Sequence, residues 1–227
     1  MKTLDTISFV ANQSDKAILF HSATGKDSIA LLELIQPHFS HIHCVYMYTV
    51  KGLSFVEKYI RYAERKYGNI SFLQVPHYSL TYNLRDGYLG VKKLDGKKSF
   101  SLADINECIR HKTGVQWTFY GFKKSDSMNR RLMLNSYGDT AICHSTCKCY
   151  PLADWSNAKV LKYIKANRLI SPIKYGKGAS GGENVSDIDF LLWARDKRPK
   201  DYALIVAQFP MSEQIIFEYE YKQKQEV

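Results

Sequence analysis

One stretch near the start of the chain contains residue types that hold phosphate: Ser22, Ala23, Thr24, Gly25, Lys26, Asp27 and Ser28. It lies between an apolar run and apolar residues at helical spacing, which predicts a strand, a tight loop and a helix start. The first turn of a helix leaves backbone N–H groups without partners, and its dipole favours an anion. The stretch therefore predicts a phosphate-binding loop; the alternative is an ordinary capped helix after a buried strand.

A second group of polar residues follows a later apolar run, 116–121, that we expect to be a strand. Gly121, Lys123, Ser127 and Arg130 come at or just past its end. Two cations and a hydroxyl at a strand end can hold a second anion. The alternative is a basic turn with a structural role.

Three cysteines lie within seven residues: Cys143, Cys147 and Cys149. Thiols at this density, with His144 among them, can ligate zinc or an iron–sulfur cluster. The spacing is not that of a standard zinc finger. In the structural alternative, Cys147 and Cys149 alternate on a strand and share one buried face as small apolar side chains.

The elements that position these residues are read from hydrophobic periodicity. Strands are expected at 17–21, 42–50, 70–75 and 116–121, and helices at 29–35, 55–67 and 102–110. Alternation of strand and helix predicts a mainly parallel sheet with ligands at the carboxyl ends of its strands. Residues 78–100 have little periodicity and are expected to form a loop or a small insert over the site.

The last sixty residues contain weaker patterns. Residues 175–184 are rich in Gly and are expected to form a loop, and 186–195 reads as a capped helix. Residues 203–206 are a helix or strand, and 214–222 an edge strand or a terminal helix used for dimer contact. A homo-oligomer is therefore one of the expected partners.

Composition limits the class of protein. The 227 residues are 45% hydrophobic, which suits a folded globular chain. The sequence has 32 Lys and Arg against 22 Asp and Glu, a net charge of +10. This charge favours an anionic partner such as a nucleotide or a nucleic acid. A solvated basic surface explains the excess of positive charge equally well. No run approaches the ~20 apolar residues of a membrane span, no leader segment is recognised, and an odd number of cysteines suits a reducing compartment. We expect a cytoplasmic protein with no membrane partner.

Three segments resemble one family, in the same order. Residues 22–28 resemble the Ser-Gly-Gly-Lys-Asp-Ser pyrophosphate loop of the ATP pyrophosphatase and phosphoadenosine-phosphosulfate (PAPS) reductase superfamily, the PP-loop proteins. Residues 121–130 resemble its Gly-x-Arg-x-x-Glu-Ser-x-x-Arg segment, with Lys123 for Arg and Asp126 for Glu. Residues 150–164 resemble its Pro-Leu-x-x-Trp segment, in which we expect Ser156 to cap a helix.

The resemblance implies a Rossmann-like, adenine nucleotide α-hydrolase-like layered α/β fold with a mainly parallel central sheet. It implies a nucleotide-binding domain over residues 1–165, with 166–227 as a C-terminal extension packed on the same domain. The ligand implied is an adenine nucleotide, held by residues 22–28 with Gly121 and Ser127.

The resemblance also implies the chemistry. The sequence of Gly25 to Ser28 is intact, which in this family favours ATP, with Mg²⁺ and with pyrophosphate as leaving group, over PAPS. Lys26 would stabilise phosphate charge, Asp27 would help position Mg²⁺, and Lys123 and Arg130 would hold the α-phosphate or an acceptor that the sequence does not name. The expected function is an ATP pyrophosphatase that adenylates this acceptor.

Two alternatives remain at this point. A sulfonucleotide reductase acting with a thiol reductant needs a nucleophilic cysteine, and no cysteine follows Cys149 in the sequence, so Cys143, Cys147 or Cys149 would have to serve. A non-catalytic nucleotide- or nucleic-acid-binding module is supported by the basic charge alone.

Overall fold

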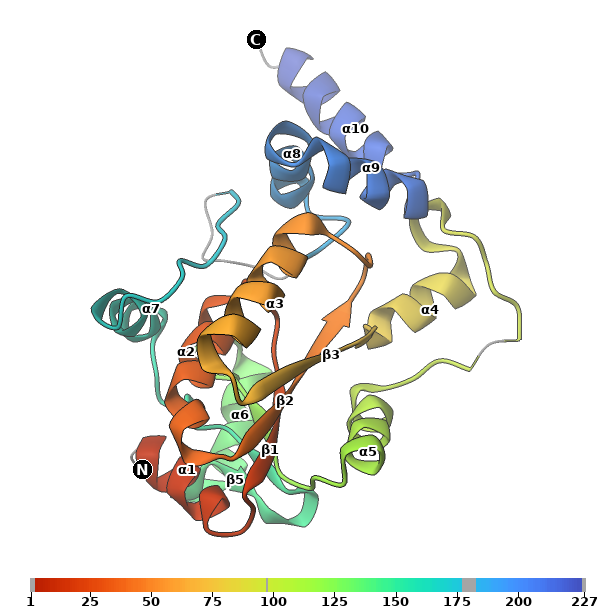
Figure 1. The fold of residues 1–227 in the computed structure, drawn as a ribbon. Coiled ribbons are helices and arrows are strands. Elements are labelled where there is room, and N and C mark those ends of the chain that lie inside the picture. Colours follow the sequence, from red (N-terminus) through yellow and green to blue (C-terminus); the bar gives the residue numbers. More distant parts are fainter. Residues whose placement is uncertain (1–2, 97, 177–182, 226–227) are drawn as a thin grey trace. The chain divides into compact units, whose positions relative to one another are not determined.

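A computed structural model describes residues 3–96, 98–176 and 183–225 (Figure 1). The helices are α1 (Thr3–Ala11), α2 (Lys26–Ile35), α3 (Ser54–Tyr67), α4 (Tyr78–Asp86), α5 (Leu102–Thr113), α6 (Met128–Ser136), α7 (Asn157–Ala166), α8 (Ile188–Lys197), α9 (Pro199–Gln208) and α10 (Ser212–Gln225). The strands are β1 (Lys16–Phe20), β2 (His41–Tyr48), β3 (Ile70–Pro76), β4 (Thr118–Tyr120), β5 (Ile142–Cys143) and β6 (Lys148–Cys149). Short 3₁₀ helices lie at Gln36–His38, Tyr88–Gly90, Gly138–Thr140 and His144–Thr146.

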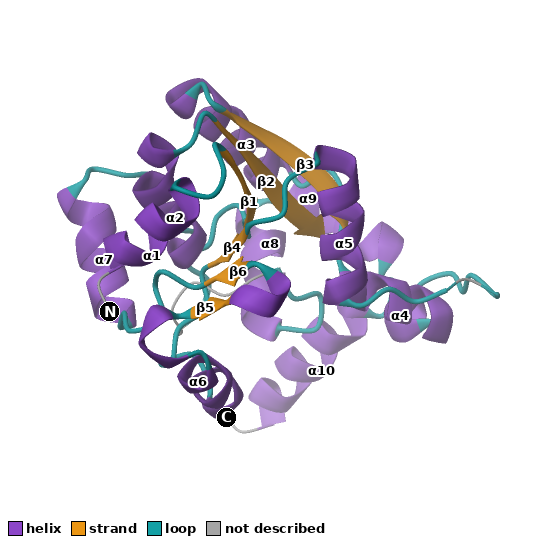
Figure 2. Ribbon diagram, turned by 90° about the horizontal axis from the view of Figure 1, so that it is seen from below, coloured by secondary structure: helices purple, strands orange, loops and turns teal. Residues whose placement is uncertain are grey.

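The strands form one sheet in the order β3-β2-β1-β4-β6-β5 (Figure 2). β1 runs parallel to β2 and to β4, β4 runs parallel to β6, and β5 pairs antiparallel with β6. The predicted α/β fold with a mainly parallel sheet is confirmed. The chain builds outward from β1 to β3 on one side and places β4 on the other, so the strand order reverses between β1 and β4. Ligands of open α/β sheets bind at such a switch point.

Contacts within the chain define two compact units. The sheet unit comprises the described residues of 3–47, 58–75 and 107–173, and the helical unit comprises those of 48–57, 76–106 and 174–225. The core of the sheet unit is built from fully buried apolar side chains of β1, α2, β2 and β4, among them Leu19, Leu32, Ile42 and Phe119. The expected boundary at residue 165, between a nucleotide-binding domain and a C-terminal extension, does not coincide with these two units and stays a prediction.

The helical unit has its own core and one buried carboxylate. Phe190 on α8 and Phe209 after α9 are fully buried. Asp201 on α9 is also buried, and its two carboxylate oxygens accept hydrogen bonds of 2.7 Å from the backbone N–H and the Oγ of Ser54, the first residue of α3. The carboxylate thus satisfies one of the N–H groups that a helix start leaves open.

Segments with weak sequence patterns are mostly helical in the structure. Residues 78–100, expected to be a loop or small insert, contain helix α4, which begins because the His77 side chain accepts a hydrogen bond from the Ser79 N–H and ends at Gly87 in the left-handed region. Residues 203–206 lie in α9 and 214–222 in α10, so the helical alternatives hold. The loop expected at 175–184 lies mostly outside the described residues.

Hydropathy predicts no membrane-spanning segment. Within the described ranges, every helix is too short or too polar to cross a bilayer.

His21 joins the end of β1 to the core of the sheet unit. Its side chain is 2% exposed, its Nε2 lies 3.0 Å from the Tyr59 hydroxyl, and its ring packs against those of Tyr59 and Phe72. Burial lowers the pKa of His21 to about 3, because the charged imidazolium cannot be solvated there. His21 is therefore a neutral packing residue directly before the loop.

This burial predicts how stability depends on pH. Below the ordinary histidine pKa of about 6.5, His21 binds a proton in the unfolded chain but stays neutral in the folded chain. The free energy of unfolding therefore falls by up to about 1.4 kcal/mol for each pH unit between about pH 6.5 and 3. Urea unfolding of wild type and His21→Gln between pH 4 and 7.5 checks this. The variant should show a shallower pH dependence; equal slopes for the two proteins would contradict it.

Candidate functional site

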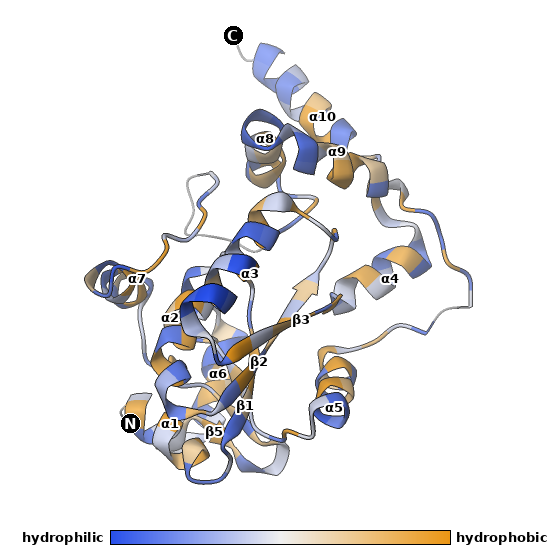
Figure 3. Cartoon of the chain, in the orientation of Figure 1, coloured by the Kyte–Doolittle hydropathy of each residue, from blue (hydrophilic) through white to orange (hydrophobic). Residues whose placement is uncertain are grey.

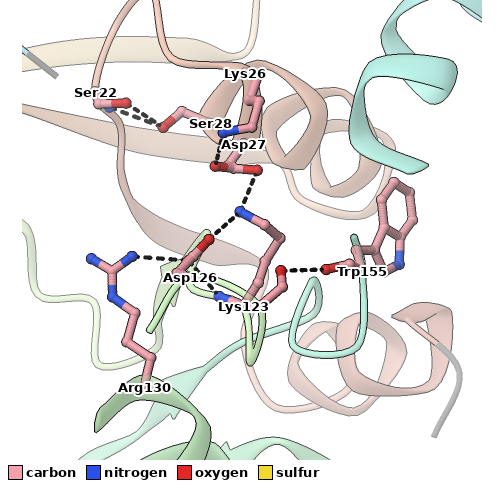
Figure 4. A network of polar contacts seen from close by, with 9 residues as sticks. Ser22, Lys26, Asp27, Ser28, Lys123, Asp126, Arg130 and Trp155 are labelled. Atoms are coloured by element: carbon pink, nitrogen blue, oxygen red, sulfur yellow. Dashed lines mark hydrogen bonds and ion pairs between the residues drawn. The ribbon is translucent and has the colours of Figure 1, made fainter. Parts of the chain in front are cut away.

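The loop between β1 and α2 is closed by the hydroxyl of Ser28. Its Oγ accepts a hydrogen bond of 3.0 Å from the backbone N–H of Ser22 and lies 3.0 Å from the Ser22 Oγ (Figure 4). The Gly25 N–H donates to the Ser22 carbonyl at 3.3 Å. These contacts fold the loop onto the first turn of α2, so Ser28 acts here as a brace, and its predicted contact with a nucleotide stays a prediction.

Two small residues allow this conformation. A Cβ built on Gly25 would lie 2.3 Å from the Ser22 Oγ, so any larger residue would displace the brace. Ala23 has a φ of 49°, in the left-handed region that costs a residue with a Cβ about 1 kcal/mol or more. Ala23 occupies a position where the resembling loop has Gly. The chain therefore keeps the loop shape at a small conformational cost.

Gly25 is also the N-cap of α2, and no side chain caps the helix at this position. The backbone N–H groups of a first turn carry partial positive charge and bind anions well. Lys26 stands in the same turn, largely buried, with its Nζ 3.1 Å from the Asp27 Oδ2. A phosphate group placed before α2 would meet both the helix start and this ammonium.

The loop is connected to the end of β4 by ion pairs of alternating charge (Figure 4). The Lys123 Nζ lies 2.7 Å from the Asp27 Oδ1 and 2.7 Å from the Asp126 Oδ1. The Asp126 Oδ2 accepts hydrogen bonds of 2.9 Å from the Lys123 N–H and from the Arg130 Nη1. Five side chains thus form one row: Lys26, Asp27, Lys123, Asp126 and Arg130. We call this row the charge row.

Lys123 is the centre of the charge row and is fully buried. Gly121 makes this possible, because a Cβ there would lie 3.3 Å from the Cβ of Asp27, tighter than most contacts of this kind. The close approach of β4 to α2 follows from the pairing of β1 with β4. In the structure Lys123 contacts two carboxylates, and its predicted contact with a ligand stays a prediction.

Asp126 holds its negative charge in a partly buried position. Burial raises the pKa of this carboxyl, but hydrogen bonds from the Lys123 side chain and backbone and from Arg130 outweigh burial and hold the pKa below its ordinary value. Asp126 is therefore a carboxylate at neutral pH. It fixes both cations that surround it.

Arg130 forms the accessible end of the charge row. Its side chain is 42% exposed, and its guanidinium lies 4.0 Å above the ring of Phe122. Ser127 is the N-cap of α6, with its Oγ accepting a hydrogen bond of 3.2 Å from the Arg130 N–H, and its predicted contact with a nucleotide stays a prediction. The guanidinium is thus held by a carboxylate, a ring and a capped helix, with one side free for an anion.

The structure brings most of the predicted nucleotide-site residues together: residues 22–28, Gly121, Lys123 and Arg130. Sequence reasoning missed Asp126 as a site residue, although the spacing of Lys123 and Asp126 was a usable signal for an ion pair across one turn. It also missed the anchoring role of Trp155, whose carbonyl accepts a hydrogen bond of 3.1 Å from Ser125 Oγ. Ser156 caps α7 as predicted.

The predicted zinc or iron–sulfur site at Cys143, Cys147 and Cys149 stays a prediction. Among the residues that the structure describes, no group of three or more His, Cys, Asp or Glu side chains is placed to hold a metal ion. The structural alternative, a shared buried face on one strand, was wrong. Cys147 precedes β6 in the left-handed region with a φ of 46° and is half-buried, whereas Cys149 is buried in β6. Burial raises the pKa of Cys149.

Asp126 supports a stability prediction. Asp126→Asn removes a charge that pairs with Lys123 and Arg130, and we expect a loss of about 2 kcal/mol at pH 7, the usual value of a hydrogen bond to a charged group. Because the folded pKa is lowered, this contribution is present above the unfolded pKa of about 4 and is lost as pH falls through the folded pKa. Chemical unfolding of both proteins from pH 7 to pH 3 measures it.

The expected result is a difference between the two proteins that shrinks towards acid pH. Lys124→Ala, which removes an ion pair with Asp154 at a more exposed position, is the control and should cost less than about 1 kcal/mol. A pH-independent cost of Asp126→Asn would show that the charge of this group is not what stabilises the fold.

Comparison with known proteins places the chain in a family. In solved structures it is similar to the U34-tRNA thiolase NcsA from Methanococcus maripaludis with its 4Fe–4S cluster (16% identity, TM-score 0.46, 87% of this chain and 72% of that chain). It is also similar to the NH3-dependent NAD synthetase from Campylobacter jejuni in complex with nitrate (13%, 0.45, 94% and 94%). A comparison with curated proteins gave no match. Residues 17–179, well over half of the sequence, match the phosphoadenosine phosphosulfate reductase domain, so the chain belongs to this family.

Proposed function

We propose that the chain is an ATP pyrophosphatase that adenylates an acceptor. In this reaction an acceptor oxygen attacks the α-phosphorus of ATP, the bond to the β-phosphate oxygen breaks, and pyrophosphate leaves. The observation that carries the proposal is the braced loop at the start of α2, which aligns a helix N-terminus and Lys26 for a phosphate chain. Membership of a nucleotide-using family supports the adenine nucleotide.

The charge row supports a division of roles. It contains three cations and two carboxylates, so it keeps one net positive charge next to the positive end of the α2 dipole. Lys26, beside the loop, would stabilise the charge that develops on the leaving pyrophosphate. Arg130, accessible and fixed in orientation, would hold the acceptor or the α-phosphate. Lys123, being buried, would keep Asp27 and Asp126 in place.

Asp27 is the residue that would hold Mg²⁺. Its carboxylate is a hard oxygen ligand at the loop, which fits this ion, and it is partly exposed. When bound, Mg²⁺ would shield phosphate charge and so help pyrophosphate to leave. In the structure the two Asp27 oxygens face the ammonium groups of Lys26 and Lys123. For Mg²⁺ to bind Asp27, the phosphates would therefore have to attract the Lys26 ammonium away from this carboxylate.

The sheet register weighs against the reductase alternative. Cys143 is level with Ile18 through the pairings of β5 with β6, of β6 with β4 and of β4 with β1. Strands β4 and β6 lie between them, so three inter-strand spacings separate the two residues. The loop begins at Ser22, just past the end of β1 and four residues further along the chain than Ile18. With about 3.3 Å per residue and about 4.8 Å per strand, Cys143 lies on the order of 20 Å from Ser22. Hydrogen bonds with Ser145, Thr146 and Tyr137 outweigh burial and lower the pKa of Cys143. The estimated separation nevertheless weighs against attack by this thiol on a phosphate or sulfate held at the loop.

The test is calorimetric titration of the full chain with ATP–Mg²⁺ and with PAPS. We expect ATP–Mg²⁺ to bind, and Lys26→Ala to weaken it at least about tenfold, a change of about 1.4 kcal/mol. Lys66→Ala, which removes an exposed lysine paired with Glu33 on another helix, is the matched control and should bind as the wild type does. An unchanged affinity in Lys26→Ala would place ATP elsewhere.

The products decide the reaction. Incubation with ATP labelled at the α-phosphate and a panel of acceptors should release pyrophosphate together with labelled AMP or an adenylated acceptor. Formation of ADP and phosphate would contradict cleavage between the α and β phosphates. Preference for PAPS, with sulfite release that is lost in Cys143→Ser, would favour the reductase.

A further inference from the structure

Two histidines lie side by side on one face of β2. His41 and His43 are two residues apart on this strand, so their side chains project from the same face of the sheet, whereas Ile42 and Cys44 are buried on the other face. The centroids of the two imidazole rings are 4.6 Å apart, and both residues are half-buried. The two rings are therefore close enough to contact one small ligand.

A hydroxyl on the neighbouring strand brings the two rings towards one point. Strand β3 lies next to β2 in the sheet, and the Oγ of Ser71 on β3 lies 2.9 Å from the His41 Nε2 and 3.5 Å from the His43 Nδ1. One nitrogen of each ring is thus near the same oxygen atom. Imidazole nitrogens that converge in this way can bind a single metal ion.

Neutral imidazoles can present both converging nitrogens as metal ligands. A neutral ring has its proton on one nitrogen only, so protons on His41 Nδ1 and His43 Nε2 leave a lone pair on each converging nitrogen. Burial lowers the pKa of His43, and the charges of His41 and Lys16 lower it further. Lys16 is exposed and is level with His41 in the pairing of β1 with β2. His43 is therefore neutral at pH 7.

The donor atoms select the kind of ion. Imidazole nitrogens suit Zn²⁺, Ni²⁺ and Cu²⁺, whereas Mg²⁺ and Ca²⁺ prefer oxygen ligands. A tetrahedral ion about 2.0–2.1 Å from each nitrogen separates the two by about 3.4 Å, which rotation of the half-buried rings can provide. Within the described ranges no group of three or more His, Cys, Asp or Glu forms a metal site. Water would occupy the other positions of the ion, so binding is weak.

The histidine pair is separate from the nucleotide loop. His41 is level with Lys16, the first residue of β1, whereas the loop begins at Ser22, past the other end of this strand. Six residues at about 3.3 Å each separate the two levels by about 20 Å. The first residues of β1 and β2 are both hydrophilic (Figure 3). An ion bound by the histidines is therefore different from the Mg²⁺ that would accompany ATP.

We propose that His41 and His43 form a binding site for a divalent transition-metal ion of the class of Zn²⁺, Ni²⁺ and Cu²⁺. The ion is bound by His41 Nε2 and His43 Nδ1, and Ser71 is a positioning residue that holds the two rings towards one point. With two protein ligands we expect a dissociation constant on the order of 10 μM. This inference does not depend on the proposed function.

Calorimetric titration of the full, chelator-treated chain with Ni²⁺ tests the proposal. The wild type should bind one ion, and His41→Ala and His43→Ala should each weaken binding at least about tenfold, because a single imidazole cannot chelate. His111→Ala, which removes an exposed histidine of α5, is the matched control and should bind as the wild type does. Lys16→Gln should tighten binding about twofold at low ionic strength, because it removes a nearby positive charge.

The thiols are the competing location for the ion. With Co²⁺ as a second probe, we expect no thiolate-to-metal charge-transfer band, and Cys143→Ser should bind Ni²⁺ as the wild type does. Circular dichroism of each variant checks that it is folded, and His43→Gln replaces His43→Ala if the alanine variant unfolds. Binding that folded variants of both histidines retain, binding that Cys143→Ser loses, or a wild type that binds no Ni²⁺ at several hundred micromolar would each overturn the proposal.

Discussion

The ammonium group of Lys123 is the point on which the candidate site depends. It is fully buried, and a buried charge is tolerated only when it is paired. Its two carboxylate partners come from the first turn of α2 and from the turn after β4, about a hundred residues apart in sequence. Removal of either carboxylate would leave a poorly compensated charge in the core of the sheet unit. The loop of residues 22–28 and the turn that leads to Arg130 are therefore fixed to each other, and this follows from the pairing of β1 with β4.

The position of this ion pair also explains how the cations are distributed. Lys123 is neutralised within the fold by Asp27 and Asp126, so the positive charge that remains lies at the two ends of the charge row, with Lys26 at the loop and Arg130 beside Phe122. A nucleotide has negative charge along a chain of phosphates. Two separated cations held in fixed orientation suit such a ligand better than one concentrated cluster, which would repel itself when empty.

Much of this site could be predicted from the sequence because its signals are local. The loop is read from a strand, a helix start and the small residues between them, and the cap at Ser156 from residue type and position. The burial of Lys123 could not be read, because it depends on a partner, Asp27, that only the sheet order brings near. The position of Cys143 is a similar case. Its sequence neighbours suggested a cluster of thiols, whereas the sheet register places it level with Ile18, in the middle of β1 and three inter-strand spacings away from it.

Helix α10 shows how a misleading pattern can itself be informative. From Phe217 to Lys222 apolar and charged residues alternate with the period of a strand, and an edge strand was one of the two expectations. The segment is helical, and a helix distributes alternating residues around its axis instead of gathering them on one face. The aromatic residues therefore cannot all turn inward, and Phe217 and Tyr221 are left outside while Ile216 is buried. Packing within the helical unit accounts for the burial of Ile216, and the period-2 pattern laid on a helix accounts for the two rings that stay exposed.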